Sequence, residues 1–300
     1  MKLKSLNVNV HEACNSRCQI CSIWKNTSTR SISLSVIQNV LQKYDFSELR
    51  DLSFTGGEAF LHKELERITT AFIGALPVLE SFAITTNGTF PEKTRKYVEF
   101  LKGTKLPCRI AISLEGPRDV HNTLRGFACY DRVISSIQEV ASAIKDYPLI
   151  KLFVSTTMTK VNANEESFQY LFRVCQEHGA IHTWRVIQQS EVYYKNIEED
   201  LYPSKEQITF LIGIIKNYYN NNDQYYTELK DFLERGEISP KCSAGKKFGY
   251  LDCSGGLFPC PFINLEINKW NNESDLSKWA SICSHCCTEC RIYPELNFKL

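Results

Sequence analysis

The sequence lacks an excess of charge of either sign, and it lacks long basic runs and long apolar runs. Its 35 Lys and Arg residues face 34 Asp and Glu residues, which leaves a net charge of +1. Because nucleic-acid binding relies on many Lys and Arg contacts to phosphates, we expect no nucleic-acid partner. No segment approaches the ~20 apolar residues of a membrane span, and the first residues lead into a short strand-like run rather than an apolar signal segment. We therefore expect no membrane partner and a cytoplasmic location.

Cysteine is scarce in the middle of the chain and concentrated toward its two ends. Three of the 13 cysteines lie at positions 14–21, three are scattered, and seven fall between positions 242 and 290. A reducing compartment and an odd count argue against a disulfide framework. The two groups predict two metal centres in separate units. We expect a core at 1–190, a linker with helices at 191–236 and a small domain at 237–300.

The densest cysteine motif is Cys14-x3-Cys18-x2-Cys21. Three thiolates at this spacing can hold three corners of a cubane iron–sulfur cluster and leave one iron open to another molecule, whereas four cysteines complete a cluster. Zinc is the alternative, but a zinc site typically has a second Cys or His pair ~15–20 residues further on. The next cysteine is Cys108, so the spacing favours a cluster over zinc.

Strand-like and helix-like segments alternate up to about residue 190. The strand-like runs are Leu6–Val10, Leu52–Thr55, Ser81–Thr85, Arg109–Ser113, Leu152–Thr157 and Trp184–Gln188. The helix-like stretches between them are Leu34–Lys43, Leu65–Leu76, Pro91–Leu101, Asp131–Lys145 and Phe168–Glu177, and two more follow at Gln207–Tyr218 and Tyr225–Arg235. Ser33 suits the N-cap of the first helix, and Gly179 suits the end of the one at 168–177. The alternation predicts an α/β fold with a parallel sheet and helical crossovers, whose chemistry lies at the carboxyl ends of the strands.

Turn motifs follow three consecutive predicted strands. Thr55-Gly56-Gly57-Glu58 follows the second strand, Thr86-Asn87-Gly88 the third, and Ser113-Leu114-Glu115-Gly116 the fourth. Each motif alone is typical of an ordinary turn. The paired glycines also let the backbone approach a ligand closely, and the Glu58 carboxylate suits a cationic group such as an amine. All three motifs fall at the strand ends where chemistry is expected.

In this order, the motifs resemble the radical S-adenosylmethionine (SAM) superfamily over roughly residues 5–190. The resemblance rests on the three-cysteine motif with apolar Ile20 before its last cysteine, on Gly56-Gly57-Glu58, and on the turn at Ser113–Gly116. It implies a partial (β/α)6 barrel, similar to a TIM barrel, with a [4Fe–4S] cluster on the three cysteines. In this family the open iron chelates SAM, and one electron from a reductant such as flavodoxin or ferredoxin cleaves it. The resulting 5′-deoxyadenosyl radical abstracts hydrogen from a substrate. Ala59 is a departure, since family members often have proline after Gly-Gly-Glu.

The resemblance also implies which residues contact SAM. Gly56, Gly57 and Glu58 match the segment that holds the amino group of SAM, while Asn87 and Ser113 match polar positions near its methionine and ribose parts. Arg125 is a candidate for the SAM carboxylate, and the backbone near Ile187 is a candidate for the adenine. An arginine after a strand is also typical of a surface ion pair.

The C-terminal cysteines resemble the SPASM/twitch extension of radical SAM enzymes, which binds auxiliary [4Fe–4S] clusters. Cys242-x12-Gly255-x4-Cys260 opens this region, and Cys283-x2-Cys286-Cys287-x2-Cys290 closes it. Because the chain stops ten residues after Cys290, the one-cluster twitch form fits better than the two-cluster form. Its expected ligands are Cys242, Cys260 and either Cys283 with Cys286 or Cys287 with Cys290. Zinc is again the alternative, as is a second auxiliary cluster that includes Cys253.

The sequence also supports predictions for free cysteines and for paired tyrosines. Some radical SAM epimerases use a free cysteine as a hydrogen donor, and the candidates for that role here are Cys253 and Cys287. The tyrosine pairs at 193–194, 218–219 and 225–226 are expected on the surface or in packing.

Three functional hypotheses follow from these motifs. The first is an oxidoreductase that dehydrogenates a small polar biosynthetic substrate, or forms a bond in it, with the help of an auxiliary cluster. It is favoured because the barrel begins by about residue 6, so we expect no leader-peptide-binding domain before it. The second is a maturase that crosslinks a peptide through a thioether or carbon–carbon bond, or epimerises one of its residues. The third is a non-catalytic metal-binding scaffold, against which the intact cysteine triad and Glu58 argue.

Overall fold

A computed structural model describes residues 2–219, 223–236, 242–269 and residue 286. Within these residues, one sheet contains β1 (Ser5–Asn9), β2 (Asp51–Thr55), β3 (Ser81–Thr86), β4 (Cys108–Ser113), β5 (Ile150–Met158), β6 (Ile181–Val186), β7 (Phe248–Leu251) and β8 (Leu257–Phe258). The strand order is β6-β5-β4-β3-β2-β1-β7-β8. Neighbouring strands are parallel except β7 and β8, which are antiparallel. Since β6 and β8 are separate edges, the sheet curves without closing, which confirms the predicted partial barrel.

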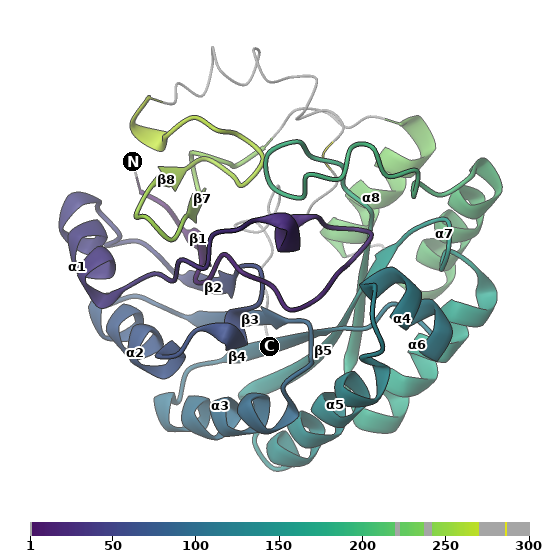
Figure 1. Cartoon of the computed structure of the whole chain (residues 1–300), viewed down its shortest axis with the longest axis horizontal. Coiled ribbons are helices and arrows are strands. Elements are labelled where there is room, and N and C mark those ends of the chain that lie inside the picture. The colour runs from purple at the N-terminus through teal and green to yellow at the C-terminus, as the bar shows by residue number, and fades with distance from the viewer. Residues whose placement is uncertain (1, 220–222, 237–241, 270–285, 287–300) are drawn as a thin grey trace.

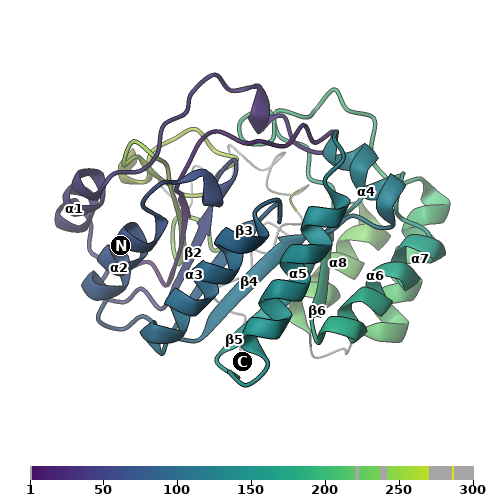
Figure 2. The same ribbon diagram turned by 60° about the horizontal axis from the view of Figure 1, so that its bottom comes forward.

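Helices cover the outside of this sheet. They are α1 (Leu34–Lys43), α2 (Leu65–Ala75), α3 (Pro91–Thr104), α4 (Arg118–Arg125), α5 (Tyr130–Ile144), α6 (Glu165–His178), α7 (Lys205–Tyr218) and α8 (Gln224–Arg235). Short 3-10 helices occur at η1 (Ile23–Lys25), η2 (Ala59–Leu61) and η3 (Ile267–Lys269). Figure 1 shows the helices in an arc around the strands. Figure 2 shows the long loop after β1 lying across one end of the barrel. In the described part of the chain, no helix has the length and apolar character needed to cross a membrane.

Alternation along each strand separates the core from the barrel interior. In β4, Ile110 and Ile112 are fully buried in the core between sheet and helices, whereas Arg109, Ala111 and Ser113 line an interior cavity. Closed barrels of this kind usually fill their interior with branched apolar side chains. The small and polar residues that point inward here leave room for a ligand instead.

Most predicted elements match the structure within a few residues. The helix at Leu34–Lys43 has the predicted bounds, and the Ser33 side chain accepts a hydrogen bond from a backbone amide of its first turn. Gly179 follows α6 with a left-handed φ of 60°, as predicted. β6 begins at Ile181 rather than Trp184, because its pairing with β5 begins there.

Two elements differ from the sequence prediction. α4 occupies a stretch after β4 for which the sequence predicted no helix, since its eight residues hold few apolar side chains. β7 lies within the segment 237–300 that we predicted as a small domain, yet it pairs with β1 and so adds a strand to the barrel sheet. The local sequence pattern does not predict this pairing, because the partner strand β1 lies near the other end of the chain.

The β6 edge of the barrel is covered by α8. The Trp184 amide donates a hydrogen bond to the Tyr226 hydroxyl at 3.0 Å. An edge strand otherwise presents such backbone groups without a partner. The aromatic ring of Tyr226 lies 3.7 Å from that of Tyr219, centroid to centroid. Tyrosines from the α7–α8 region are thereby held beside the barrel interior.

Candidate active site

A cavity of about 820 Å³ occupies the barrel interior. The residues predicted for the N-terminal cluster and for SAM all line it: Cys14, Cys18, Cys21, Gly56, Gly57, Glu58, Asn87, Ser113, Arg125 and Ile187. They come from the loop after β1, from the turns after β2 and β3, from the last residues of β4 and α4, and from the residue after β6. The volume falls within the ~300–1,000 Å³ range of small-molecule sites.

The loop that carries the three cysteines, residues 11–21, is fixed on one side by the Gly-Gly-Glu turn. The Gly57 amide donates to the His11 carbonyl at 2.7 Å, and the Glu58 amide donates to the Ala13 carbonyl at 2.9 Å. A β-carbon at position 57 would lie 2.2 Å from the Ala13 carbonyl oxygen. Glycine is therefore required at this position by the close approach of two backbones.

On its other side the same loop rests on the end of α4. The Arg17 amide donates to the Arg125 carbonyl at 3.0 Å, and the Gln19 amide donates to the Leu124 carbonyl at 2.9 Å. Gly126 ends the helix with φ +73°, and a β-carbon there would lie 2.1 Å from the Arg17 carbonyl oxygen. A left-handed cap with no side chain thus lets the loop dock on the helix end.

Cys18 of this loop is buried, Cys14 and Cys21 are half-buried, and hydrogen-bond donors approach the thiols of Cys14 and Cys18. Asn87 Nδ2 lies 3.9 Å from Cys14 Sγ, and Arg125 donates to Cys18 Sγ at 3.6 Å. Burial raises the pKa of Cys14 to about 11 and that of Cys21 to about 12. Both therefore stay protonated at neutral pH unless a cation lies beside them, and metal binding removes those protons.

This donor set suits a cluster better than a single ion. Among the described residues, no three His, Cys, Asp or Glu side chains converge as they would around one metal ion. A cubane cluster binds each cysteine through a different iron, so the three thiols need not converge on one point. Hydrogen bonds to the sulfurs of the cluster tune its reduction potential. The three thiols and the donors beside them fit a [4Fe–4S] cluster.

Glu58 is buried, with 1% of its surface exposed. Its carboxylate accepts hydrogen bonds from the Phe60 amide at 3.0 Å, the Thr86 hydroxyl at 2.8 Å and the Asn87 amide at 2.7 Å. Burial raises the pKa of Glu58, and these three hydrogen bonds oppose that rise. Besides lining the cavity, Glu58 therefore joins the turn after β2 to the turn after β3.

Asn87 links the turn after β3 to the cysteine loop. Its Nδ2 donates to Asn15 Oδ1 at 2.7 Å and to Ser16 Oγ at 3.0 Å. Its side chain is thus engaged with the loop, while the SAM contacts expected of Asn87 and Ser113 stay predictions.

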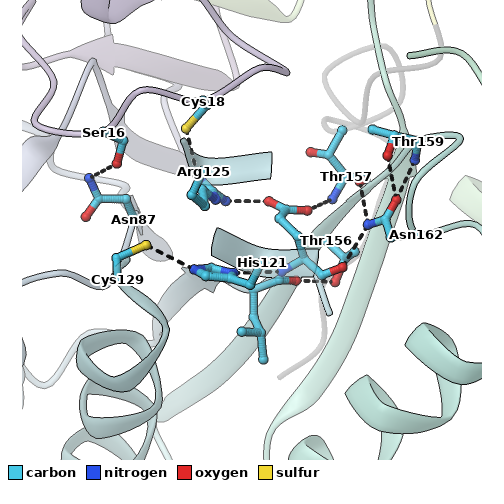
Figure 3. A network of polar contacts seen from close by, with 12 residues as sticks. Ser16, Cys18, Asn87, His121, Arg125, Cys129, Thr156, Thr157, Thr159 and Asn162 are labelled. Carbon is cyan, nitrogen blue, oxygen red and sulfur yellow. Dashed lines mark hydrogen bonds and ion pairs between the residues drawn. The ribbon is translucent and has the colours of Figure 1, made fainter. Parts of the chain in front are cut away.

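Arg125 lies in a buried network rather than in a surface ion pair (Figure 3). Its guanidinium lies 2.5 Å from Glu115 Oε1, and the other oxygen of that carboxylate accepts the Thr157 amide at 2.8 Å. The side chains of Arg125 and Glu115 are 9% and 0% exposed. The role of Glu115 was not predicted; the signal available was an acidic residue in the turn at Ser113–Gly116 and an arginine ten positions later.

His121 was assigned no role from the sequence, yet it supports this network. Its Nδ1 accepts the Glu115 backbone amide at 3.1 Å. Burial lowers the pKa of His121 to about 3, so the ring is neutral and carries its proton on Nε2. That nitrogen lies 3.3 Å from Cys129 Sγ, which fixes the sulfur as the acceptor.

Replacing His121 with asparagine is expected to make the cluster-free protein less sensitive to acid. The native ring stays neutral, but the unfolded chain binds a proton below the ordinary pKa of 6.5, so unfolding becomes easier as the pH falls from about 6.5 toward 3. At ~1.4 kcal/mol per pH unit, His121 lowers the free energy of unfolding by about 2 kcal/mol between pH 7 and pH 5. Urea unfolding at both pH values measures this loss. His121→Asn keeps an acceptor for the Glu115 amide, and an unchanged pH dependence in this variant would refute the neutral ring.

Tyrosines form part of the cavity wall. Tyr218 is 47% exposed, as predicted, but the cavity is lined by Tyr193, Tyr194, Tyr219, Tyr225 and Tyr226. The expectation that these residues serve only the surface or packing is therefore too narrow. They reach the interior because α8 and the segment after β6 close the open side of the barrel.

The C-terminal cysteines fall into two groups in the structure. Cys242, Cys260 and Cys286 pack in one apolar group with residues such as Phe262. The Cys253 thiol donates to the Asn9 carbonyl at 3.0 Å, and Cys253 is not among the described residues that line the cavity. The other three predicted positions, Cys283, Cys287 and Cys290, lie outside the described residues.

Comparison with known proteins agrees with this geometry. The sequence model of a family described as the radical SAM superfamily matches residues 8–175, more than half of the chain. A GTP 3′,8-cyclase of Stenotrophomonas maltophilia is 32% identical over 28% of this chain, and the match spans 26% of that protein. A GTP 3′,8-cyclase of Campylobacter fetus is 24% identical over 97% of this chain and 90% of its own length. A cysteine-type anaerobic sulfatase-maturating enzyme of Clostridium perfringens is 21% identical, over 93% and 86%.

Solved structures share the fold. SuiB of Streptococcus suis bound to SAM matches with a TM-score of 0.65 and 16% identity, over 92% of this chain and 65% of that chain. Native anSMEcpe with bound SAM and a Cp18Cys peptide matches with a TM-score of 0.59 and 17% identity, over 92% and 80%. The chain thus spans somewhat less than two thirds of the SuiB structure.

Proposed function

The chain belongs to the radical SAM superfamily, and on this premise we propose that it oxidises a small polar biosynthetic substrate after abstracting a hydrogen atom from one of its C–H bonds. The family uses a [4Fe–4S] cluster and SAM as cofactors. The observation that carries the proposal is the cavity in which the cysteine loop, the Gly-Gly-Glu turn and a polar barrel interior meet.

In this proposal the core at 1–190 holds the first cluster on Cys14, Cys18 and Cys21. SAM lies on the Gly-Gly-Glu turn, near Asn87, Ser113, Arg125 and Ile187. The segment 237–300 holds one auxiliary cluster, with Cys242, Cys260 and Cys286 among its ligands. When bound, these groups and an external reductant such as flavodoxin or ferredoxin supply an electron, a 5′-deoxyadenosyl radical and an acceptor for the electron that the substrate loses. The protein orients the substrate beside SAM and excludes water.

The polar barrel interior favours a small molecule over a peptide. Inward-facing positions include Asn7, Ser53, Thr85, Ser155 and Thr183, which all line the cavity. Hydroxyl and amide groups at these positions can pair with the hydroxyls of a sugar or nucleotide, whereas apolar side chains could not. The full-length similarity to a GTP 3′,8-cyclase, whose name includes a nucleotide, agrees with this class.

A peptide maturase is the second candidate. It is favoured by the similarity to a sulfatase-maturating enzyme and by the fold shared with SuiB, which has been solved with the precursor peptide SuiA. The two classes separate in a deoxyadenosine-release assay with panels of sugars, nucleotides and peptides. Stimulation by peptides alone would replace the first candidate with the second.

The cofactor content is tested by replacing Cys14, Cys18 and Cys21 together with alanine. After anaerobic reconstitution we expect about eight irons per chain in the wild type and about four in this variant, with loss of SAM cleavage. Cys175→Ala is the matched control, because this buried cysteine of α6 lies far in sequence from both groups and should leave eight irons. A reduced, iron-loaded wild type that never cleaves SAM would favour a non-catalytic scaffold.

A further inference from the structure

The guanidinium of Arg125 lies between a thiol of the cysteine loop and a buried carboxylate. It donates to Cys18 Sγ at 3.6 Å through Nη1, and its Nη2 lies 2.5 Å from Glu115 Oε1. Figure 3 shows the Cys18 thiol against the Arg125 side chain. A positive charge therefore lies against one predicted cluster ligand, and a compensating negative charge lies one step further away.

This arrangement is held rigidly from the Glu115 side. The carboxylate accepts the Thr157 amide at 2.8 Å, the Glu115 amide donates to His121 Nδ1 at 3.1 Å, and the Glu115 carbonyl accepts from Asn162 Nδ2 at 2.8 Å. All of these groups are buried. Glu115 is thus anchored through its amide, its carbonyl and its side chain, and it fixes the guanidinium in turn.

We propose that Glu115 and Arg125 are positioning residues that set the reduction potential of the cluster on Cys14, Cys18 and Cys21. Reduction adds negative charge to the cluster, so a guanidinium beside Cys18 favours the reduced state and the Glu115 carboxylate opposes it. In a buried site this effect is poorly screened by solvent. The inference rests on the proposed function, because it requires a cluster on this loop.

The test uses two substitutions that act in opposite directions. Glu115→Gln removes the negative charge and is expected to raise the potential, whereas Arg125→Gln removes the positive charge and is expected to lower it. The expected size is about tenfold in the ratio of reduced to oxidised cluster at a fixed solution potential, which is about 59 mV for a one-electron couple. The potential is measured on the reconstituted full chain by electron paramagnetic resonance, from the signal that changes when SAM is added.

Arg118→Gln is the matched control. Arg118 lies on the same helix, α4, and pairs with Asp131, but its side chain is 52% exposed. Solvent screens this pair, so its loss should leave the potential unchanged. If Arg118→Gln shifts the reduction potential as much as Arg125→Gln does, the loss of any positive charge from α4 has the same effect, and the proposal is overturned.

A purely structural role for the pair predicts another result. Both single variants would then lower the thermal stability of the cluster-free protein without shifting the reduction potential in opposite directions, and this result would refute the proposal.

If Arg125→Gln does not fold, the double variant Glu115→Gln/Arg125→Gln replaces it. Its potential should lie below that of the wild type, since the removed positive charge is the nearer one to Cys18, and a value at or above the wild type would refute the proposal. Absence of iron on the loop of the wild type would instead refute the proposed function.

Discussion

Replacing Gly57 with alanine is expected to prevent the loop at residues 11–21 from holding its cluster. A β-carbon at this position would lie 2.2 Å from the carbonyl oxygen of Ala13 and 2.4 Å from its carbonyl carbon. Both are backbone atoms, so relief requires the loop itself to move. Because a misplacement of about 1 Å near a catalytic site can cost roughly a hundredfold in rate, SAM cleavage should fall by about that factor or more. The iron bound to this loop should be lost as well.

Iron per chain and deoxyadenosine release measure these losses, while thermal unfolding of the cluster-free protein reports on the fold. Gly103→Ala is the matched control: Gly103 lies in α3, and a β-carbon added there would have no neighbouring atom within 4 Å. An alanine in a helix should stabilise the protein by about 0.5–1 kcal/mol and leave the iron content unchanged. A fully loaded Gly57→Ala protein would show that the loop tolerates displacement, and that the backbone contact is not what positions the cysteines.

Features carried by one segment were predictable from the sequence. The spacing of Cys14, Cys18 and Cys21 and the glycines at 56–57 depend only on local order, and the alternation of strands and helices placed their segments at one end of a sheet. The parallel sheet followed from the same alternation, because parallel strands require crossovers, whereas the partial barrel followed from the resemblance to the radical SAM superfamily. These features suffice to predict the family and the fold.

Features that depend on pairs of distant residues were not predictable in this way. Glu115 carries the sequence pattern of an ordinary turn, and only the structure brings its carboxylate to Arg125 and the Thr157 amide. β7 joins β1 across nearly the whole chain, and the Tyr226 hydroxyl reaches the Trp184 amide at the sheet edge. Each contact is selected by tertiary packing, which leaves no periodic signal in the residues concerned.

Glu58 is expected to be one of the residues on which stability depends most, in addition to any contact with SAM. Replacing Glu58 with alanine leaves the Phe60 amide, the Thr86 hydroxyl and the Asn87 amide without their acceptor in a buried site. At about 1–3 kcal/mol for each buried donor left unsatisfied, and with partial relaxation, the free energy of unfolding should fall by about 4 kcal/mol. Urea unfolding of the cluster-free protein measures this loss without any contribution from SAM.

Glu58→Gln separates the structural role from the SAM role. The amide keeps the shape and one acceptor oxygen but places an NH₂ group where the second oxygen accepts a donor, so we expect a loss of about 1–3 kcal/mol. Glu99→Gln is the control, because Glu99 pairs with Lys102 on the surface and its loss should cost less than about 0.5 kcal/mol. If Glu58 serves only the amino group of SAM, Glu58→Gln will weaken SAM binding and leave the unfolding curve unchanged. Loss of stability in the absence of SAM would mean that the same carboxylate builds the turn on which SAM is proposed to lie.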